Sequence, residues 1–358
     1  MKKKHRYFGI TARTLMILSG ALLILSYLSI FINPAKFWMM TVFGLLYIPI
    51  LLLNLFLLAW AVIRHSKAFW IPLSVLLPSI AILGRNFQLG SGHEFAPKAD
   101  DVKIISYNVG RFNDGPAGAA ATRDSIISFI SRQRADIICL QEVSFNQASS
   151  LEMKLSEKFG DYDIEYYVYT QKSGVYGNVT LSRLPIRGKG KIVFEKSANM
   201  ALYGDYEIGG RLMRVYNCHF QSYNISLSGI GKALRRDAGG TVRETERKMS
   251  SSLSLRPRQV DAVIRDIESC ALPCLVVGDF NDTPMSYTYW RLSRGRGDSF
   301  MEAGEGFGAT YSMLRPLLRI DYVLYPCEML EAVSHQVFTD VRYSDHYPLA
   351  ATLRQKNQ

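Results

Sequence analysis

Hydrophobic residues follow two different patterns along this 358-residue chain. The N-terminal quarter contains long uncharged runs, whereas the rest alternates short apolar runs with turn-forming residues. Residues 15–32, 37–63 and 68–84 are the three uncharged runs, of 18, 27 and 17 positions. A helix needs about 20 apolar residues to cross the hydrocarbon core, so the first two runs qualify as spans. The third is shorter and contains two prolines, yet it is too apolar for a soluble linker, and we expect it to span as well.

Charge is divided unevenly along the chain, and this division favours a lipid bilayer as partner of residues 1–90. The sequence has 42 basic residues (Lys and Arg) and 31 acidic residues (Asp and Glu). Residues 1–98 hold ten of the basic residues and one of the acidic residues. The remainder therefore holds 32 basic and 30 acidic residues. Basic residues ahead of the first run place the N-terminus in the cytoplasm by the positive-inside rule. Three spans of a cell (inner) membrane would leave the rest of the chain on the non-cytoplasmic side, and two spans would leave it in the cytoplasm; we expect three.

After a linker at 91–100, residues 101–355 show the short runs typical of strands, interrupted by stretches with helical spacing. The pattern predicts sheets covered by helices. Strands are expected at 102–107, 136–140, 164–169, 177–181, 211–218, 274–277, 320–324 and 349–353, and helices at 122–134, 151–159 and 258–268. Residues 222–256, rich in Ser, Gly, Arg and Lys, read as a flexible basic insertion.

The five cysteines predict neither a zinc site nor a disulfide framework, because their number is odd and no Cys-x-x-Cys occurs. Cys270 and Cys274 would pair only in an oxidising compartment, and the sequence leaves that open.

Polar residues terminate or open the predicted strands, where ligand sites of layered α/β folds gather. A lone Asn or Asp at such a position is usually a turn former, but repetition at six strand ends favours one shared site. Carboxylate and amide oxygens suit Mg²⁺ or Mn²⁺, and a carboxylate with a histidine can orient and deprotonate water. The residues concerned are Asn108, Glu142, His219, Asp279, Asn281, Asp321, Asp345 and His346.

Six motifs in order resemble those of a membrane-anchored, bacterial-type member of the endonuclease/exonuclease/phosphatase superfamily, which has a deoxyribonuclease-I-like fold. The match runs from about residue 102 to residue 353. The motifs are Tyr107-Asn108-Val109, Leu140-Gln141-Glu142, Asn217-Cys218-His219-Phe220, Gly278-Asp279-Phe280-Asn281-Asp282, Arg319-Ile320-Asp321-Tyr322-Val323-Leu324 and Ser344-Asp345-His346-Tyr347-Pro348-Leu349. The resemblance implies an α/β fold: a four-layered α/β/β/α sandwich with two packed mixed sheets flanked by helices, preceded here by an all-α membrane region.

The resemblance also implies roles for individual residues. Glu142 resembles the main Mg²⁺ ligand, with Asn108 beside it and Asp345 as a further metal contact. Asp279 would hold the attacking water and Asn281 a phosphate oxygen. His346 would pair with Asp321, and His219 resembles the second histidine of the nuclease and sphingomyelinase branches. Asn178 and Arg183 lie in lesser signatures and are expected at the substrate phosphate.

The sequence therefore predicts a membrane-tethered, Mg²⁺-dependent hydrolase that cleaves a phosphodiester by direct attack of water, with Mn²⁺ as a possible substitute. Nucleic acid and a lipid headgroup both stay open as substrates, and no obligate protein partner is inferred. An inositol-phosphate-type phosphomonoesterase is one alternative. The other is a non-catalytic membrane scaffold that retains the fold.

Overall fold

The computed structural model describes residues 2–90, 96–113, 118–145, 148–171, 174–195, 197–223, 238–313 and 318–356. The chain divides into two compactly packed units, the N-terminal unit and the sandwich unit. The N-terminal unit comprises Met1–Asn86, Asn224–Pro257 and Asp282–Trp290, and the sandwich unit comprises Phe87–Tyr223, Arg258–Asn281 and Arg291–Gln358. Each unit thus combines several separate stretches of sequence, whereas each predicted domain is one continuous stretch. The limits of the predicted domains stay predictions.

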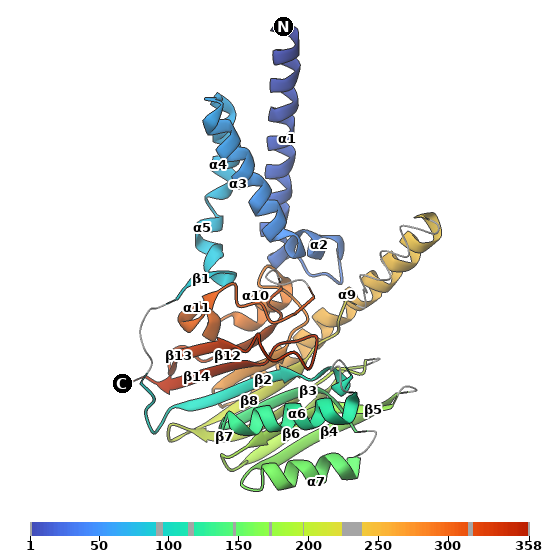
Figure 1. Ribbon diagram of the computed structural model, residues 1–358, viewed down its shortest axis with the longest axis vertical. Coiled ribbons are helices and arrows are strands. Elements are labelled where there is room, and N and C mark those ends of the chain that lie inside the picture. The colour runs from blue at the N-terminus through green and yellow to red at the C-terminus, as the bar shows by residue number, and fades with distance from the viewer. Residues whose placement is uncertain are drawn as a thin grey trace. The chain divides into compact units, whose positions relative to one another are not determined.

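Helices make up the N-terminal unit (Figure 1). They include α1 (Lys2–Leu28), α2 (Met39–Leu45), α3 (Tyr47–Ile63), α4 (Trp70–Leu76) and α5 (Ser79–Ile82). Two helical stretches, Thr11–Phe31 and Lys67–Arg85, are long and apolar enough to cross a membrane. The predicted span at 37–63 forms α2 and α3, bent by 59° at their junction, and the described helices provide three spans if this bent pair counts as one. Pro49 explains the break, because its ring crowds the carbonyl of the residue four positions earlier.

Strands dominate the sandwich unit and form two six-stranded sheets. One has the order β13-β14-β2-β3-β5-β4 and the other β10-β12-β9-β8-β7-β6, and β1 pairs with β11 separately. The first sheet comprises β2 (Val102–Asn108), β3 (Ile137–Ser144), β4 (Asp163–Gln171), β5 (Gly174–Ser182), β13 (Leu330–Val337) and β14 (Leu349–Gln355). The second comprises β6 (Gly188–Val193), β7 (Met200–Ile208), β8 (Arg211–His219), β9 (Cys274–Asp279), β10 (Gly297–Asp298) and β12 (Asp321–Tyr325). The short pair is β1 (Gln88–Leu89) with β11 (Glu305–Gly306).

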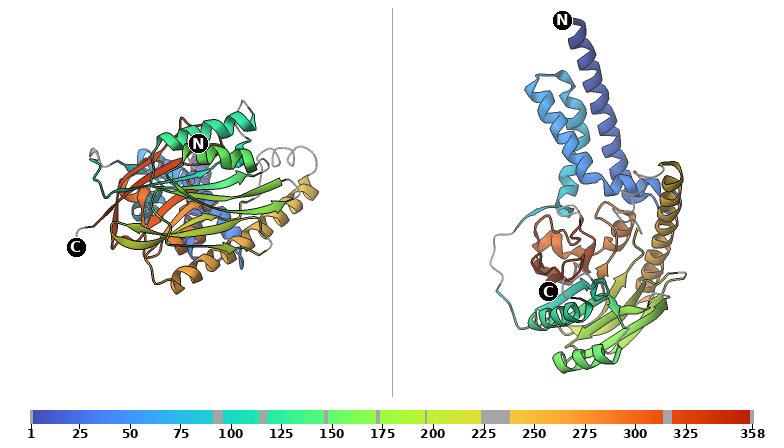
Figure 2. Two further views of the ribbon diagram at one scale, coloured as in Figure 1. Left: turned by 90° about the horizontal axis from the view of Figure 1, so that it is seen from below. Right: turned by 45° about the vertical axis from the view of Figure 1, so that its right-hand side comes forward.

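Buried hydrophobic clusters lie between the layers of this unit. Between the sheets, Ile104 and Cys139 pack with Val215 and Val277 in one buried cluster. The outer face of the first sheet is covered by α6 (Ala119–Arg132) and α7 (Ala148–Lys158), whose buried face includes Ile126. Helix α9 (Ala238–Ser269) enters this unit at Arg258, and its part from there lies on the opposite side of the strands from α6 and α7 (Figure 2, left). Short helices α10 (Tyr287–Ser293) and α11 (Ser299–Ala303) complete the fold. The predicted α/β sandwich is confirmed.

Residues 238–256 of the predicted insertion belong to α9, and residues 224–237 lie outside the described chain. The prediction of an insertion rested on a composition rich in Ser, Gly, Arg and Lys, but Arg243–Met249 consists almost entirely of strong helix formers. Strands β6, β7 and β13 also went unpredicted, because their interrupted patterns carry little periodicity. Cys270 and Cys274 are both free thiols.

Candidate active site

The polar residues predicted at strand ends meet at one edge of the sandwich unit. Parallel pairing aligns the C-terminal ends of β2 with β3 and of β8 with β9, which places His219 opposite Asp279. β12 runs antiparallel to β9, so its first residue, Asp321, pairs with Asp279 as well. β14 runs antiparallel to β2, so His346, three residues before β14, arrives near Asn108. Strand direction therefore explains why residues so far apart in sequence gather here.

Asp279 is the centre of the site and is fully buried. Its Oδ2 accepts hydrogen bonds from the side-chain amides of Asn108 and Asn281, each at 2.9 Å. The backbone N–H of Asn281 donates to Oδ1 at 2.8 Å. Burial raises the pKa of Asp279 to about 6, against the charge of the nearby His346. A carboxylate held this way has a fixed orientation and a proton affinity suited to general base work near neutral pH.

Asn281 orients Asp279 in this arrangement. Its amide nitrogen donates to Asp279 and to the carbonyl oxygen of Phe220 at 3.0 Å, which occupies both amide hydrogens. The residue lies at φ +52, a strained conformation for a residue other than glycine. The expected direct contact of Asn281 with a substrate phosphate would require one of these hydrogen bonds to break.

His346 forms a buried pair with Asp321. The Nδ1 atom of the imidazole lies 2.9 Å from Oδ2 of Asp321, and its Nε2 lies 3.7 Å from Oδ2 of Asp279. Burial opposes a charge on the ring, but Asp321 and Asp279 outweigh burial and hold the pKa of His346 well above its ordinary value. The pair thus provides a positively charged Nε2 donor directed at the centre of the site.

Glu142 enters the site through a distortion of β3. The pairing register with β5 shifts between Leu140 and Val143, and Glu142 lies at φ +52. Such a bulge re-aims one side chain out of the regular alternation. Oε2 of Glu142 accepts from Nε of Arg111 at 3.2 Å, and Oε1 lies 3.5 Å from Nε2 of His219. Burial would raise the pKa of Glu142, yet the charges of His219 and Arg111 hold it below the ordinary value, so the group is ionised.

Asp345 lies at the rim of the same cluster. Its Oδ1 accepts a 3.3 Å hydrogen bond from Oγ of Ser344, and that hydroxyl is 2.8 Å from the carbonyl oxygen of Asn108. The side chain is half-buried, in contrast to the buried Asp279 and His346.

These donors fit a divalent cation that prefers oxygen ligands. Asp279, Asp321 and His346 each offer a ligand atom, and these atoms lie within 4.8 Å of one another. Within the described chain, Oδ1 of Asp321 is buried with no hydrogen-bond partner. Asp321 and His346 are already joined by a hydrogen bond suited to proton transfer. The predicted cation ligands Glu142 and Asn108 lie beside this group, since Asn108 donates to Asp279, and their role as ligands stays a prediction.

Two predicted phosphate-binding residues are not brought into the site. Asn178 is 1% exposed, and its amide points to the carbonyl oxygens of Met200 and Asn217, where it bridges the sheets. Arg183 follows the far end of β5, where it lies near Asp136. Asn178 thus lies beneath the strands that end at His219, and Arg183 lies at the opposite end of β5; the role of the two residues at a substrate phosphate stays a prediction.

Sequence reasoning missed the polar residues that lock the two sheets beneath the site. Gln141 is fully buried, and its side-chain amide donates to Oδ1 of Asn217 at 2.8 Å. Both residues stood inside recognised motifs, so the signal was available. Arg111 was also missed, although its guanidinium lies 4.4 Å from the centre of the Tyr176 ring and contacts Glu142. Nothing in the local pattern distinguishes Arg111 from a loop arginine.

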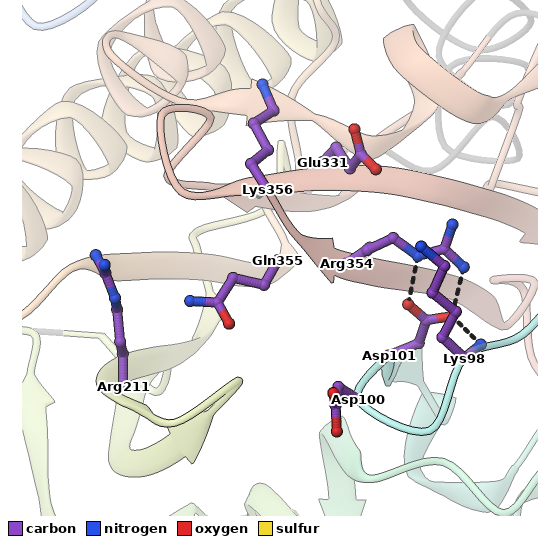
Figure 3. Close-up of a pocket in the computed structure, with 8 residues that line it drawn as sticks. All are labelled: Lys98, Asp100, Asp101, Arg211, Glu331, Arg354, Gln355 and Lys356. Carbon is purple, nitrogen blue, oxygen red and sulfur yellow. Dashed lines mark hydrogen bonds and ion pairs between the residues drawn. The ribbon is translucent and has the colours of Figure 1, made fainter. Parts of the chain in front are cut away.

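A cavity of about 590 Å³ lies at the opposite ends of the same strands, away from this site (Figure 3). Its lining is charged, but Arg354 is already held by Asp101 at 2.8 and 2.9 Å. The candidate site is at the other edge, where the buried Asp and His residues gather.

Comparison with known proteins agrees with this geometry. The model of the Endonuclease/Exonuclease/phosphatase family matches residues 105–346, and a family described as a domain of unknown function matches residues 9–86. No curated protein matches the sequence. A solved endonuclease/exonuclease/phosphatase from Beutenbergia cavernae is similar, with 18% identity, TM-score 0.52 and coverage of 72% of each chain. Another from Bacteroides vulgatus has 19% identity and TM-score 0.51, covering 72% of this chain and 99% of that one. The human Nocturnin catalytic domain has 16% identity and TM-score 0.54, covering 74% and 97%.

Proposed function

This chain belongs to the Endonuclease/Exonuclease/phosphatase family, and from that premise we propose that it is a membrane-tethered, Mg²⁺-dependent phosphodiesterase. Mn²⁺ would substitute for Mg²⁺. The observation that carries the proposal is the buried Asp279, held by Asn108 and Asn281 and facing Nε2 of His346. A scaffold without activity has no use for a buried carboxylate fixed beside a charged imidazole, because both groups cost stability.

The residues divide the reaction between them. A cation held by Glu142 and Asn108 would stabilise the negative charge that develops on the phosphoryl group. Asp279 orients a water for attack on phosphorus and accepts its proton. His346, kept in one tautomer and charged by Asp321, donates its Nε2 proton to the leaving oxygen as the bond between that oxygen and phosphorus breaks. Nε2 of His219 lies 3.5 Å from Oε1 of Glu142 and 3.7 Å from Oδ2 of Asp279, where the imidazole stabilises the negative charge of the two carboxylates.

A lipid headgroup is the substrate class that the chain favours. A nuclease needs a basic surface to neutralise the nucleic-acid backbone, but residues 99–358 hold 32 basic and 30 acidic residues. The apolar helices Thr11–Phe31 and Lys67–Arg85 support an anchor in the cell membrane. Anchoring raises the effective concentration of a substrate that lies in the same bilayer. The sulfate bound by the human Nocturnin catalytic domain is consistent with a site for tetrahedral oxyanions in this fold.

One side-by-side assay tests the proposal. The full-length protein in detergent would be offered sphingomyelin and phosphoinositide vesicles, plasmid DNA, RNA and soluble inositol phosphates, each with Mg²⁺. We expect release of a phosphorylated headgroup, with the His346→Ala variant as the inactive control. Cleavage of DNA with a steep loss of binding as salt rises would identify a nuclease instead. Release of inorganic phosphate alone would identify a phosphomonoesterase, and no hydrolysis of any substrate would contradict the proposal.

A further inference from the structure

The segment that follows the catalytic turn is part of the N-terminal unit. Asp282–Trp290 continues the chain directly from Asn281, yet it packs with the N-terminal helices. Met285 is 1% exposed within an apolar cluster formed by residues of α1, α3 and α4. The ring of Trp290 meets that of Phe31 edge-on at 5.3 Å. The helices therefore hold this segment at both its middle and its end.

The backbone at Met285 is held especially closely. Oγ of Ser29 lies 3.0 Å from the carbonyl oxygen of Met285 and 2.6 Å from that of Ser26. Gly44 faces the same carbonyl, and a Cβ atom at position 44 would overlap the Met285 oxygen and lie 2.6 Å from Ser29 Oγ. Only a glycine allows this approach, because a backbone carbonyl cannot rotate away as a side chain can.

The start of the segment is fixed by a buried ion pair. Arg256, on α9, lies 3.0 Å from Oδ2 of Asp282, and the two side chains are 1% and 2% exposed. A buried charge requires its partner, so the pair holds the residue directly after Asn281 in one position.

The catalytic turn needs support from its following residues. Asn281 lies at φ +52, and a strained conformation persists only when the surroundings over-determine it. On the N-terminal side, the hydrogen bonds from Asn281 to Asp279 supply that support. On the C-terminal side, the support comes from Asp282 and Met285 as packed in the N-terminal unit.

We propose that Ser29 and Gly44 are positioning residues, and that the N-terminal helices set the geometry of Asp279 and Asn281 through Asp282–Trp290. The helices are then part of the catalytic apparatus and not only an anchor. This inference rests on the proposed phosphoesterase activity for its kinetic consequence. A displacement of about 1 Å at a reacting group can cost on the order of 100-fold in rate, so small shifts of this segment would be visible.

The test compares two helix glycines in the full-length protein. Gly44→Ala inserts a methyl group against the Met285 carbonyl, whereas Gly20→Ala meets only the side chain of Val75 at 3.4 Å, an ordinary contact. Ser29→Ala removes the hydroxyl without adding volume. Turnover of bis(4-nitrophenyl) phosphate with Mg²⁺ would be measured in detergent, together with hydrogen–deuterium exchange of the peptide covering residues 278–285.

We expect Gly44→Ala to lower kcat about 10- to 100-fold with KM within about twofold, because the probe still meets the same binding groups. The kcat and KM of Gly20→Ala should stay within about twofold of the values of the unaltered protein. Ser29→Ala should lower kcat in the same direction, and it carries the test if Gly44→Ala does not fold. Exchange over 278–285 should accelerate in Gly44→Ala and not in Gly20→Ala.

Unchanged kcat and unchanged exchange in both Gly44→Ala and Ser29→Ala would overturn the inference. If the unaltered protein hydrolyses no phosphoester while exchange still responds to Gly44→Ala, the proposed activity fails and the positioning role is supported.

Discussion

Oδ2 of Asp321 lies 2.9 Å from Nδ1 of His346, and both side chains are buried. Asp321 is itself fixed, because its backbone N–H donates to Oγ1 of Thr310 at 3.1 Å. The two side chains therefore form one unit that presents Nε2 of His346 to Asp279.

Loss of either member of this unit should damage the same step. We expect His346→Ala to lower kcat on the order of 10²–10⁴-fold, and Asp321→Ala to act in the same direction. The double variant should be scarcely worse than His346→Ala alone, because residues that act as a unit are not additive. Turnover of the three variants, with circular dichroism to confirm folding, tests this. Multiplicative losses would show that the two residues act separately.

Activity should depend on a divalent cation bound by Glu142 and Asn108. We expect EDTA to abolish turnover and Mg²⁺ or Mn²⁺ to restore it, because the donors are oxygens. Glu142→Gln should raise the cation concentration needed for half-maximal activity or remove activity. Titration of both proteins with Mg²⁺ after dialysis against chelator measures the effect. Full activity in excess EDTA would exclude the assigned cation site.

Asp279→Asn should be severe by itself. The amide cannot accept a proton from water, so we expect kcat to fall by at least about 100-fold. Cys139→Ser is the matched control, since Cys139 is fully buried between the sheets and away from the site. That change should lower the melting temperature more than it lowers turnover. Near-normal turnover of a folded Asp279→Asn protein would contradict the mechanism.

The sandwich unit is expected on the non-cytoplasmic side of the membrane. Basic residues precede the first apolar run, and an odd number of spans would carry the C-terminus across. A reporter fused to Gln358 that is active only in the cytoplasm should stay silent. Signal from this reporter would mean that residues 68–84 do not span.

Glu165 should make the folded protein less stable as the pH rises. This side chain is 8% exposed, its Oε2 has no hydrogen-bond partner among the described residues, and burial raises its pKa to about 7. The carboxyl releases its proton near 4.5 in the unfolded chain but near 7 in the folded one, so ionisation opposes folding across that window. Glu165→Gln should therefore melt at a higher temperature than the unaltered protein at pH 8. At pH 4, below both pKa values, the gain should disappear. Thermal unfolding of the full-length proteins at the two pH values measures the difference, and an equal gain at both would contradict the assignment.

Local sequence determined much of this protein. The short apolar runs predicted eight strands, and the polar residues at their ends pointed to eight members of the candidate site, from Asn108 to His346. This succeeded because strand patterns and motif spacing are short-range properties. The uncharged runs likewise predicted the apolar helices, but Pro49 produced a bend that run length could not show.

Only the tertiary structure decided how these residues act together. Asn108 and Asp279 are 171 positions apart, and their hydrogen bond exists because two sheets pack face to face with their strand ends aligned. Arg183 matched a motif but lies near Asp136, at the opposite end of its strand from Asn178, which the motif alone does not specify. The attachment of Asp282–Trp290 to the N-terminal helices likewise depends on Gly44 and Ser29, more than two hundred positions away. Sequence patterns report which face of an element is buried, whereas the partner that buries it is chosen by packing of the whole chain.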